Sequence, residues 1–128
     1  MSLGQSLLAP TRIYVPALLA LHRAHLLRAA AHITGGGLPG NLPRVLPEGL
    51  GAVLDRTAWD EPRVFAEIQR LGSVADDEMD RVFNRGIGMA LVVDAGTVED
   101  ARTALAANGP AAPVIGEVVA GEPGVRYR

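Results

Sequence analysis

The segment Ile87-Gly88-Met89-Ala90-Leu91-Val92-Val93 carries the clearest strand signal in the chain. Its residues are apolar on both faces, a pattern typical of a strand in the middle of a sheet that helices cover on both sides. Before it, residues 76–83 predict a helix whose first turn is acidic. After it, Thr97 is the expected N-cap of a helix over 98–107, which stops at Asn108-Gly109. A buried strand between two helices indicates a fold built from layers of helix and sheet.

Prolines mark where further helices begin. Pro16 suits the first turn of a helix because its missing N–H group costs nothing there, and Pro62 opens another helix in the same way. The remaining expected elements are helices over 16–24, 40–45 and 62–72 and strands over 51–55, 113–119 and 125–127. We therefore expect an α+β or α/β fold in layers, with helices covering the sheet.

Residues 26–34 allow two interpretations. Intrinsic propensity favours continuing the preceding helix. The abrupt stop at Gly35-Gly36-Gly37 also suits a buried strand that enters a tight loop. The pattern of residues alone leaves this choice open.

The composition is that of an ordinary globular chain. Of 128 residues, 48% are hydrophobic and 20% are charged, which fits a single domain over residues 1–128. The absence of cysteine excludes disulfides, thiolate catalysis and cysteine-based zinc or iron–sulfur sites. No apolar run reaches the roughly 18 residues of a spanning helix, and the N-terminus lacks a signal-peptide pattern. We expect a cytoplasmic protein with no membrane partner.

The charges are unevenly distributed along the chain. All twelve basic residues are arginine, so neither lysine Schiff-base chemistry nor a P-loop lysine is available within this chain. Residues 1–54 contain four arginines, one acid and all three histidines, whereas residues 55–128 contain eight arginines and thirteen acids. This excess of positive charge favours a local anion site in the first half. It is too sparse for a nucleic-acid surface.

The segment His32-Ile33-Thr34-Gly35-Gly36-Gly37 is the strongest candidate for chemistry. Three glycines let backbone N–H groups approach a ligand closely and turn together toward an anion. A helix starting after them would add a positive dipole end. His32 could orient, polarise or protonate an oxyanion at neutral pH. The plainer alternatives are a simple turn and a packed histidine bonded to backbone.

Other polar and aromatic residues have structural explanations. His22 and His25 could share a helical face but have no carboxylate near them in sequence, so we interpret them as surface histidines. The acidic run Asp76–Asp80 fits the first turns of a helix without any ligand. Trp59 and Phe65 are expected to pack in the core. The nucleophile-elbow, GxGxxG and Walker patterns are missing.

Three motifs together resemble a known family. The segments Leu8–Val15, Ala31–Leu38 and Asn41–Pro47 are similar, in this order and spacing, to the carboxy-terminal domain of phosphoribosylformylglycinamidine cyclo-ligases, also called AIR synthetases. The match continues through Trp59 to Gly86–Met89. The related superfamily includes selenophosphate synthetase, thiamine-monophosphate kinase and the larger amidotransferase that makes the cyclo-ligase substrate. The Asn41–Pro47 segment favours the cyclo-ligase.

The resemblance implies both a fold and a function. The fold is a layered α+β domain with a mixed β-sheet covered by helices, which places a strand over residues 27–34. The function is a step of purine biosynthesis, in which ATP activates the formyl oxygen of formylglycinamidine ribonucleotide and ring closure gives aminoimidazole ribonucleotide. ATP and Mg²⁺ are then held mainly by an amino-terminal domain that residues 1–128 lack, and the full-length enzyme is a homodimer. The fragment alone is expected to be inactive.

The expected site combines the glycine-rich segment with residues of the matching motifs. His32 is the expected catalytic residue, and no metal ligand is expected. The residues expected to bind substrate or phosphate are Arg12, Thr34, Gly35, Gly36, Gly37 and Asn41.

Two residues depart from the family pattern. Pro16 stands where a basic residue is usual, and Asp80 stands where Tyr is common. These departures leave the glycines intact but put local contacts in question. They keep open a second function, a stand-alone binding or assembly module without catalysis.

Overall fold

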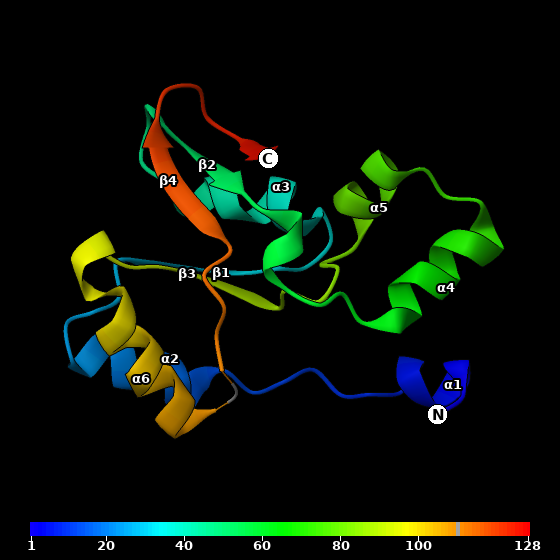
Figure 1. Ribbon diagram of the computed structural model, residues 1–128, viewed down its shortest axis with the longest axis horizontal. Helices are drawn as coiled ribbons and strands as arrows, with labels where there is room; N and C mark the ends of the chain where they lie inside the picture. Colours follow the sequence, from blue (N-terminus) through cyan, green and yellow to red (C-terminus); the bar gives the residue numbers. More distant parts are fainter. Residues whose placement is uncertain (110) are drawn as a thin grey trace.

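The computed structural model describes residues 1–109 and 111–128 and contains two small sheets (Figure 1). In the first sheet, β1 (Ala29–His32) pairs antiparallel with β3 (Met89–Val92). In the second, β2 (Leu50–Leu54) lies between β4 (Gly116–Ala120), which is antiparallel to it, and β5 (Val125–Tyr127), which is parallel. The expected α+β class is confirmed, with a mixed sheet among its layers.

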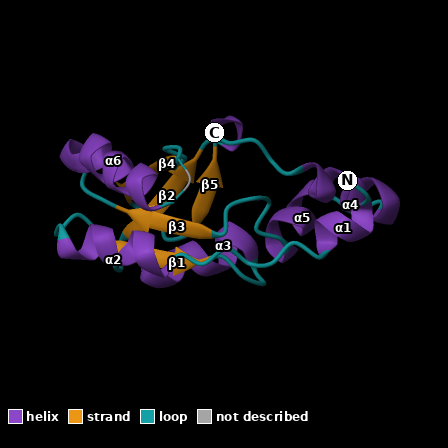
Figure 2. Cartoon of the chain, turned by 90° about the horizontal axis from the view of Figure 1, so that it is seen from below, coloured by secondary structure: helices purple, strands orange, loops and turns teal. Residues whose placement is uncertain are grey.

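Helices cover the two-stranded sheet on one side and form a second group at the other end of the molecule. Figure 1 shows α2 and α6 lying together below β1 and β3. Figure 2 shows α1, α4 and α5 gathered beyond the ends of the strands. The helices are α1 (Leu3–Leu7), α2 (Val15–Arg23), α3 (Gly37–Asn41), α4 (Arg63–Gly72), α5 (Asp76–Val82) and α6 (Val98–Asn108). None of the helices in the described residues is long and apolar enough to cross a membrane.

The choice left open for residues 26–34 is resolved in favour of the strand. Helix α2 ends at Arg23, where His25 adopts the left-handed conformation with φ 58°. The Leu26 N–H donates to the Leu21 carbonyl at 3.0 Å, and the His25 N–H donates to the His22 carbonyl at 3.0 Å. These two bonds form a Schellman motif, which closes the helix. Because the helix ends there, the following residues can adopt the extended conformation of β1.

Strand β3 is packed on both faces but does not lie in the middle of a sheet, so that part of the prediction is wrong. Among the described residues it pairs only with β1. Ala90 belongs to the core between the two sheets, whereas Leu91 packs on the core under α2 and α6. The strand is apolar on both faces because it separates two cores. A second pairing partner is not needed to explain its sequence.

Two local expectations need correction. The helix expected over 40–45 begins earlier, at Gly37, and is followed by a 3₁₀ turn over Leu42–Val45. It begins there because Gly36 and Gly37 adopt φ values of 103° and 61°, which turn the chain before Leu38. Thr97 precedes α6 without capping it, since its hydroxyl donates to the Asp94 carbonyl at 3.0 Å.

The other expected elements are confirmed within a few residues. Pro16 lies in the first turn of α2, and Pro62 immediately precedes α4. Helix α1 was not expected. Ser2 and Gln5 close it with a capping box, in which each side chain accepts from the backbone N–H group of the other residue.

Candidate functional site

The glycine loop, residues Thr34–Gly37, connects β1 to α3 at the end of the two-stranded sheet. The Gly37 N–H donates to the Thr34 carbonyl at 3.0 Å, which closes a turn. Gly37 is buried, and a β-carbon there would collide with the carbonyl oxygens of Asp80 and Phe83. The loop is therefore seated tightly on α5 and the residue that follows it. Only glycine fits at position 37.

Asn41 fixes the conformation of the glycine loop from inside. Its side chain is 6% exposed, and its amide Nδ2 donates to the carbonyl oxygens of Thr34, Gly35 and Gly37 at 3.2, 3.3 and 2.8 Å. The Asn41 Oδ1 accepts from the Thr34 hydroxyl at 3.3 Å. One buried amide thus organises the loop.

This arrangement orients the backbone N–H groups of the glycine loop. In a trans peptide the C=O and N–H groups point in opposite directions, and the described residues contain no cis bond. Because the Thr34 and Gly35 carbonyls point toward Asn41, the N–H groups of Gly35 and Gly36 point away from it. Neither N–H group donates to any acceptor among residues 1–109 and 111–128. Two adjacent donors are therefore available to an anion.

His32 is the last residue of β1 and immediately precedes Ile33 and the loop. Its side chain is exposed, and its ring makes no hydrogen bond within the part of the chain that the structure describes. The ring lies edge-on to the Tyr14 ring, with the centroids 6.1 Å apart and the planes at 62°. The packed, backbone-bonded histidine that was the alternative is not what the structure shows.

Arg12 lies in a different part of the surface. Together with Tyr14 it lines an open groove of about 820 Å³ along β3, and none of residues 32–37 lines that groove. The structure therefore brings Asn41 into the glycine loop, with His32 just before the loop in the chain, whereas Arg12 lines the groove. Tyr14 touches both regions, because it lines the groove and contacts His32.

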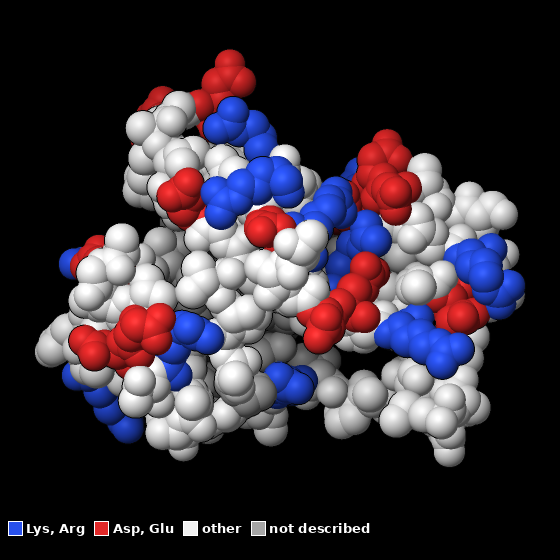
Figure 3. Space-filling model, in the orientation of Figure 1, with Lys and Arg blue, Asp and Glu red and all other residues white. Residues whose placement is uncertain are grey.

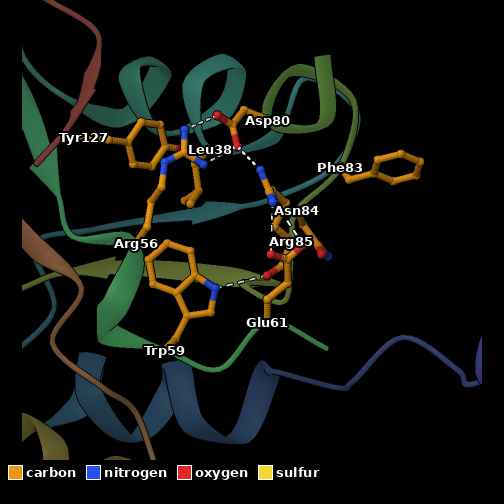
Figure 4. Close-up of a pocket in the computed structure, with 9 residues that line it drawn as sticks. All are labelled: Leu38, Arg56, Trp59, Glu61, Asp80, Phe83, Asn84, Arg85 and Tyr127. Carbon is orange, nitrogen blue, oxygen red and sulfur yellow. Dashed lines mark hydrogen bonds and ion pairs between the residues drawn. The ribbon is translucent and has the colours of Figure 1, made fainter. Parts of the chain in front are cut away.

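A second polar group, which we call the charged cluster, consists of Arg56, Glu61, Asp80 and Arg85 (Figure 4). Arg56 Nη1 donates to Asp80 Oδ1 at 2.8 Å, and its Nη2 donates to Oδ2. Arg85 Nη1 donates to the same Oδ1 at 2.8 Å, and its Nε and Nη2 donate to Glu61 at 3.0 and 3.1 Å. The Asp80 side chain is only 9% exposed. The interpretation of Asp80 as an ordinary acid of a first helical turn is therefore wrong.

The electrostatics of the charged cluster are those of a structural ion-pair network. Burial acts to raise the pKa of Asp80, but the hydrogen bonds and charges of Arg56 and Arg85 outweigh it and lower that pKa. The Arg56 guanidinium also stacks on the Tyr127 ring, 3.8 Å from its centroid. The adjoining cavity has a volume of about 50 Å³. Arg56 thus links Tyr127 of β5 to Asp80 of α5, and each charge in the cluster is compensated by an opposite charge.

The remaining residues singled out in the sequence have structural places. His22 and His25 are exposed, as expected. Trp59 packs against the core between the sheets, and its indole N–H donates to the Arg85 carbonyl at 3.0 Å. Phe65 lies edge-on to Phe83 with the ring centroids 5.8 Å apart. Among the described residues no three His, Asp or Glu side chains form a group that could hold a metal ion.

Figure 3 shows how charge is distributed on one face of the molecule. Arginine and acidic side chains lie close together in mixed groups over this face. The exposed ion pairs join residues on different elements, such as Arg28 with Asp94 at 2.6 Å, and residues one turn apart on a helix, such as Arg70 with Glu67 at 2.9 Å. These ion pairs compensate part of the charge on the surface that the structure describes.

Comparison with known proteins gives the family. The model of the AIR synthase related protein C-terminal domain matches residues 2–128. Phosphoribosylformylglycinamidine cyclo-ligase of Sorangium cellulosum is 52% identical over 120 residues, which cover 92% of this chain and 34% of that protein. The enzyme of the same name from Desulfitobacterium hafniense is 48% identical over 126 residues, which cover 98% of this chain and 37% of that protein. The one from Bordetella petrii is 50% identical over 124 residues, which cover 95% of this chain and 36% of that protein.

The chain therefore belongs to the AIR synthase related family, in which it corresponds to the C-terminal domain. The resemblance found in the sequence motifs is confirmed. The chain spans about a third of the length of these curated relatives.

Proposed function

We propose that residues 1–128 form one domain of a longer, ATP-dependent cyclo-ligase that converts formylglycinamidine ribonucleotide to aminoimidazole ribonucleotide. The observation that carries the proposal is the glycine loop. Asn41 holds its carbonyls inward and turns the N–H groups of Gly35 and Gly36 outward, and the exposed His32 directly precedes this segment at the end of β1. The relatives at 47–52% identity supply the reaction, since they are named for it.

The glycine loop suits the anionic groups of this reaction. The outward N–H groups of Gly35 and Gly36 would donate to a phosphate or to the activated formyl oxygen, since backbone donors in a nest favour negative charge. Thr34, with its exposed side chain, would lie beside the same anion. Asn41 is turned into the loop, so its role would be to hold these donors in place.

His32 would act on the oxygen that leaves. ATP, when bound, supplies the phosphoryl group that makes the formyl oxygen a leaving group. When the amidine nitrogen forms its bond to the formyl carbon, the carbon–oxygen bond breaks, phosphate departs and the nitrogen loses a proton. An imidazole beside the loop can donate a proton to the departing oxygen or stabilise its charge.

Other parts of the protein would hold ATP and Mg²⁺. The chain contains no lysine, and its described residues form no acidic group suited to a metal ion. The donors of the glycine loop fit a phosphate group but not a cation. We therefore assign ATP and Mg²⁺ mainly to an amino-terminal domain, and we expect the full-length enzyme to be a homodimer.

The test is turnover by the full-length protein that contains this chain. Purified protein is incubated with ATP, Mg²⁺ and formylglycinamidine ribonucleotide, and both ADP and aminoimidazole ribonucleotide are measured. The two products are expected in equal amounts, whereas residues 1–128 alone are expected to form neither. A full-length protein that binds the ribonucleotide but forms no product would favour the binding-module alternative and overturn the proposal.

A further inference from the structure

Tyr14 contacts His32 of the candidate site and also lines the open groove. It is the residue before α2, and its half-buried ring lies edge-on to His32 at 6.1 Å. An exposed imidazole without hydrogen bonds ordinarily moves among several rotamers on a fast timescale. An aromatic ring against one side removes the rotamers whose space it occupies. Tyr14 is thus the aromatic neighbour that limits the orientation of His32.

Gly88 provides the space that the Tyr14 ring needs. A β-carbon at position 88 would meet the Tyr14 hydroxyl oxygen directly and would lie 3.0 Å from Cζ of the ring. Gly88 is also tied to the site, because its carbonyl accepts from the Ile33 N–H at 2.9 Å. The Tyr14 side chain therefore spans from the backbone of Gly88, which directly precedes β3, to the ring of His32 on β1.

We infer that Tyr14 is a positioning residue for His32, and that Gly88 lacks a side chain because Tyr14 must occupy that space. The inference rests on the proposed function, in which His32 acts on the leaving oxygen. Tyr14 acts through its ring, since its hydroxyl makes no hydrogen bond within residues 1–109 and 111–128. A phenyl ring at this position is therefore sufficient, whereas an aliphatic side chain is not.

The kinetic test compares four variants of the full-length enzyme. Tyr14→Leu should lower kcat about tenfold or more with little change in KM, since small misplacements of a reacting group are costly. Tyr14→Phe should stay within about twofold of the wild type because it keeps the ring. Gly88→Ala should lower kcat as Tyr14→Leu does, because the ring tip must swing away. Adding Tyr14→Phe to Gly88→Ala should recover part of the loss by removing the colliding oxygen.

A spectroscopic readout separates this inference from the proposed function. The full-length protein is labelled at histidine, tyrosine and phenylalanine rings, and the His32 signal is identified by its loss in His32→Ala. A cross-relaxation signal between the Tyr14 and His32 rings is expected in the wild type and in Tyr14→Phe, but not in Gly88→Ala. Absence of this signal in the wild type would overturn the inference. So would Tyr14→Leu with normal kcat while His32→Ala is inactive.

The catalytic role of His32 can fail although the contact between the two rings is real. If His32→Ala retained normal turnover while the ring signal was present, His32 would lose its role and the contact would be purely structural. This result would overturn the inference as well as the role of His32, but the ring signal would show that the geometry was right. Thermal unfolding of each variant checks that the kinetic changes do not come from loss of fold.

Discussion

The glycine loop and the charged cluster are both polar, partly buried and seated on α5, yet their bonding differs. In the charged cluster, two arginines face two carboxylates, and each charged group finds an opposite charge within hydrogen-bond distance. In the glycine loop, the buried amide of Asn41 satisfies three carbonyls and leaves two N–H groups turned outward. Hydrogen bonds hold both regions together, but the charged cluster compensates its own charges, whereas the loop turns two backbone donors outward.

This difference predicts that substitutions in the two regions will have opposite effects. Changes at His32 should alter catalysis with little loss of stability, and changes at Gly36 should alter substrate binding. Changes in the charged cluster should alter stability with little loss of activity per folded molecule. Four measurements on the full-length protein test the separation.

The largest effect is expected for His32→Ala. Loss of a general acid or electrostatic stabiliser lowers kcat by something like 10²–10⁴-fold. The free energy of unfolding should barely change because the side chain is exposed. His22→Ala, which removes an exposed histidine of α2, is the matched control and should leave kcat unchanged. A His32→Ala enzyme with near-normal turnover would show that the loop region is also only structural.

Gly36→Val should weaken substrate binding. Gly36 has φ 103°, where a residue with a side chain is strained by roughly 1–2 kcal/mol, and the added methyl groups would obstruct the approach to its N–H group. We expect KM to rise about tenfold or more, equivalent to about 1.4 kcal/mol of binding. Gly40→Ala is the control, because a β-carbon at position 40 meets no atom within 4 Å. An unchanged KM in Gly36→Val would argue against ligand binding at the loop.

The parts of the fold that the sequence predicts are those set by local signals. A proline in the first turn predicts where α2 begins, and a proline just before it predicts the start of α4. The run of neighbouring apolar residues predicts β3. The end of α2 is not predicted in this way, because a histidine occupies the left-handed position that glycine usually takes. The strand that follows could be placed only by resemblance to a family.

In the candidate site, too, local features can be predicted from the sequence, whereas contacts between distant residues cannot. The glycine loop is visible as three glycines beside a histidine, although the part played by the Asn41 amide depends on the folded backbone. The charged cluster leaves no sequence signal, since Arg56 and Asp80 are separated by 24 residues, as are Glu61 and Arg85. From the sequence, Asp80 looks like an ordinary surface acid of a helix. Only tertiary packing brings Arg56 and Arg85 to it. The contact of Tyr14 with His32 could not be predicted either, because the two residues are far apart in the sequence and meet only in the folded chain.

Asp80→Asn tests the charged cluster. Removing this carboxylate charge leaves Arg56 and Arg85 next to each other, which should lower the free energy of unfolding by about 1–3 kcal/mol. The value lies below that of a fully buried pair because the Arg56 side chain is 41% exposed and water screens it. Chemical denaturation measures the change, and kcat should remain near the wild-type value. Glu67→Gln breaks the exposed pair with Arg70 and should have no measurable effect. A large loss of kcat in folded Asp80→Asn would show that the charged cluster takes part in catalysis, which contradicts the separation of the two regions.

The smallest effect is expected in the acid dependence of stability. Arg56 and Arg85 lower the pKa of Asp80 below its usual value of 3.8, despite the opposing effect of burial. The unfolded chain therefore binds a proton at Asp80 at a higher pH than the folded chain does. The stabilisation from Asp80 is complete above the unfolded pKa and is lost as the pH falls through the folded pKa. The difference in unfolding free energy between wild type and Asp80→Asn should be constant above about pH 5 and shrink below about pH 4. Denaturation curves at a series of pH values measure it, and a difference that stayed constant down to about pH 2 would mean that the charge of Asp80 does not support the fold.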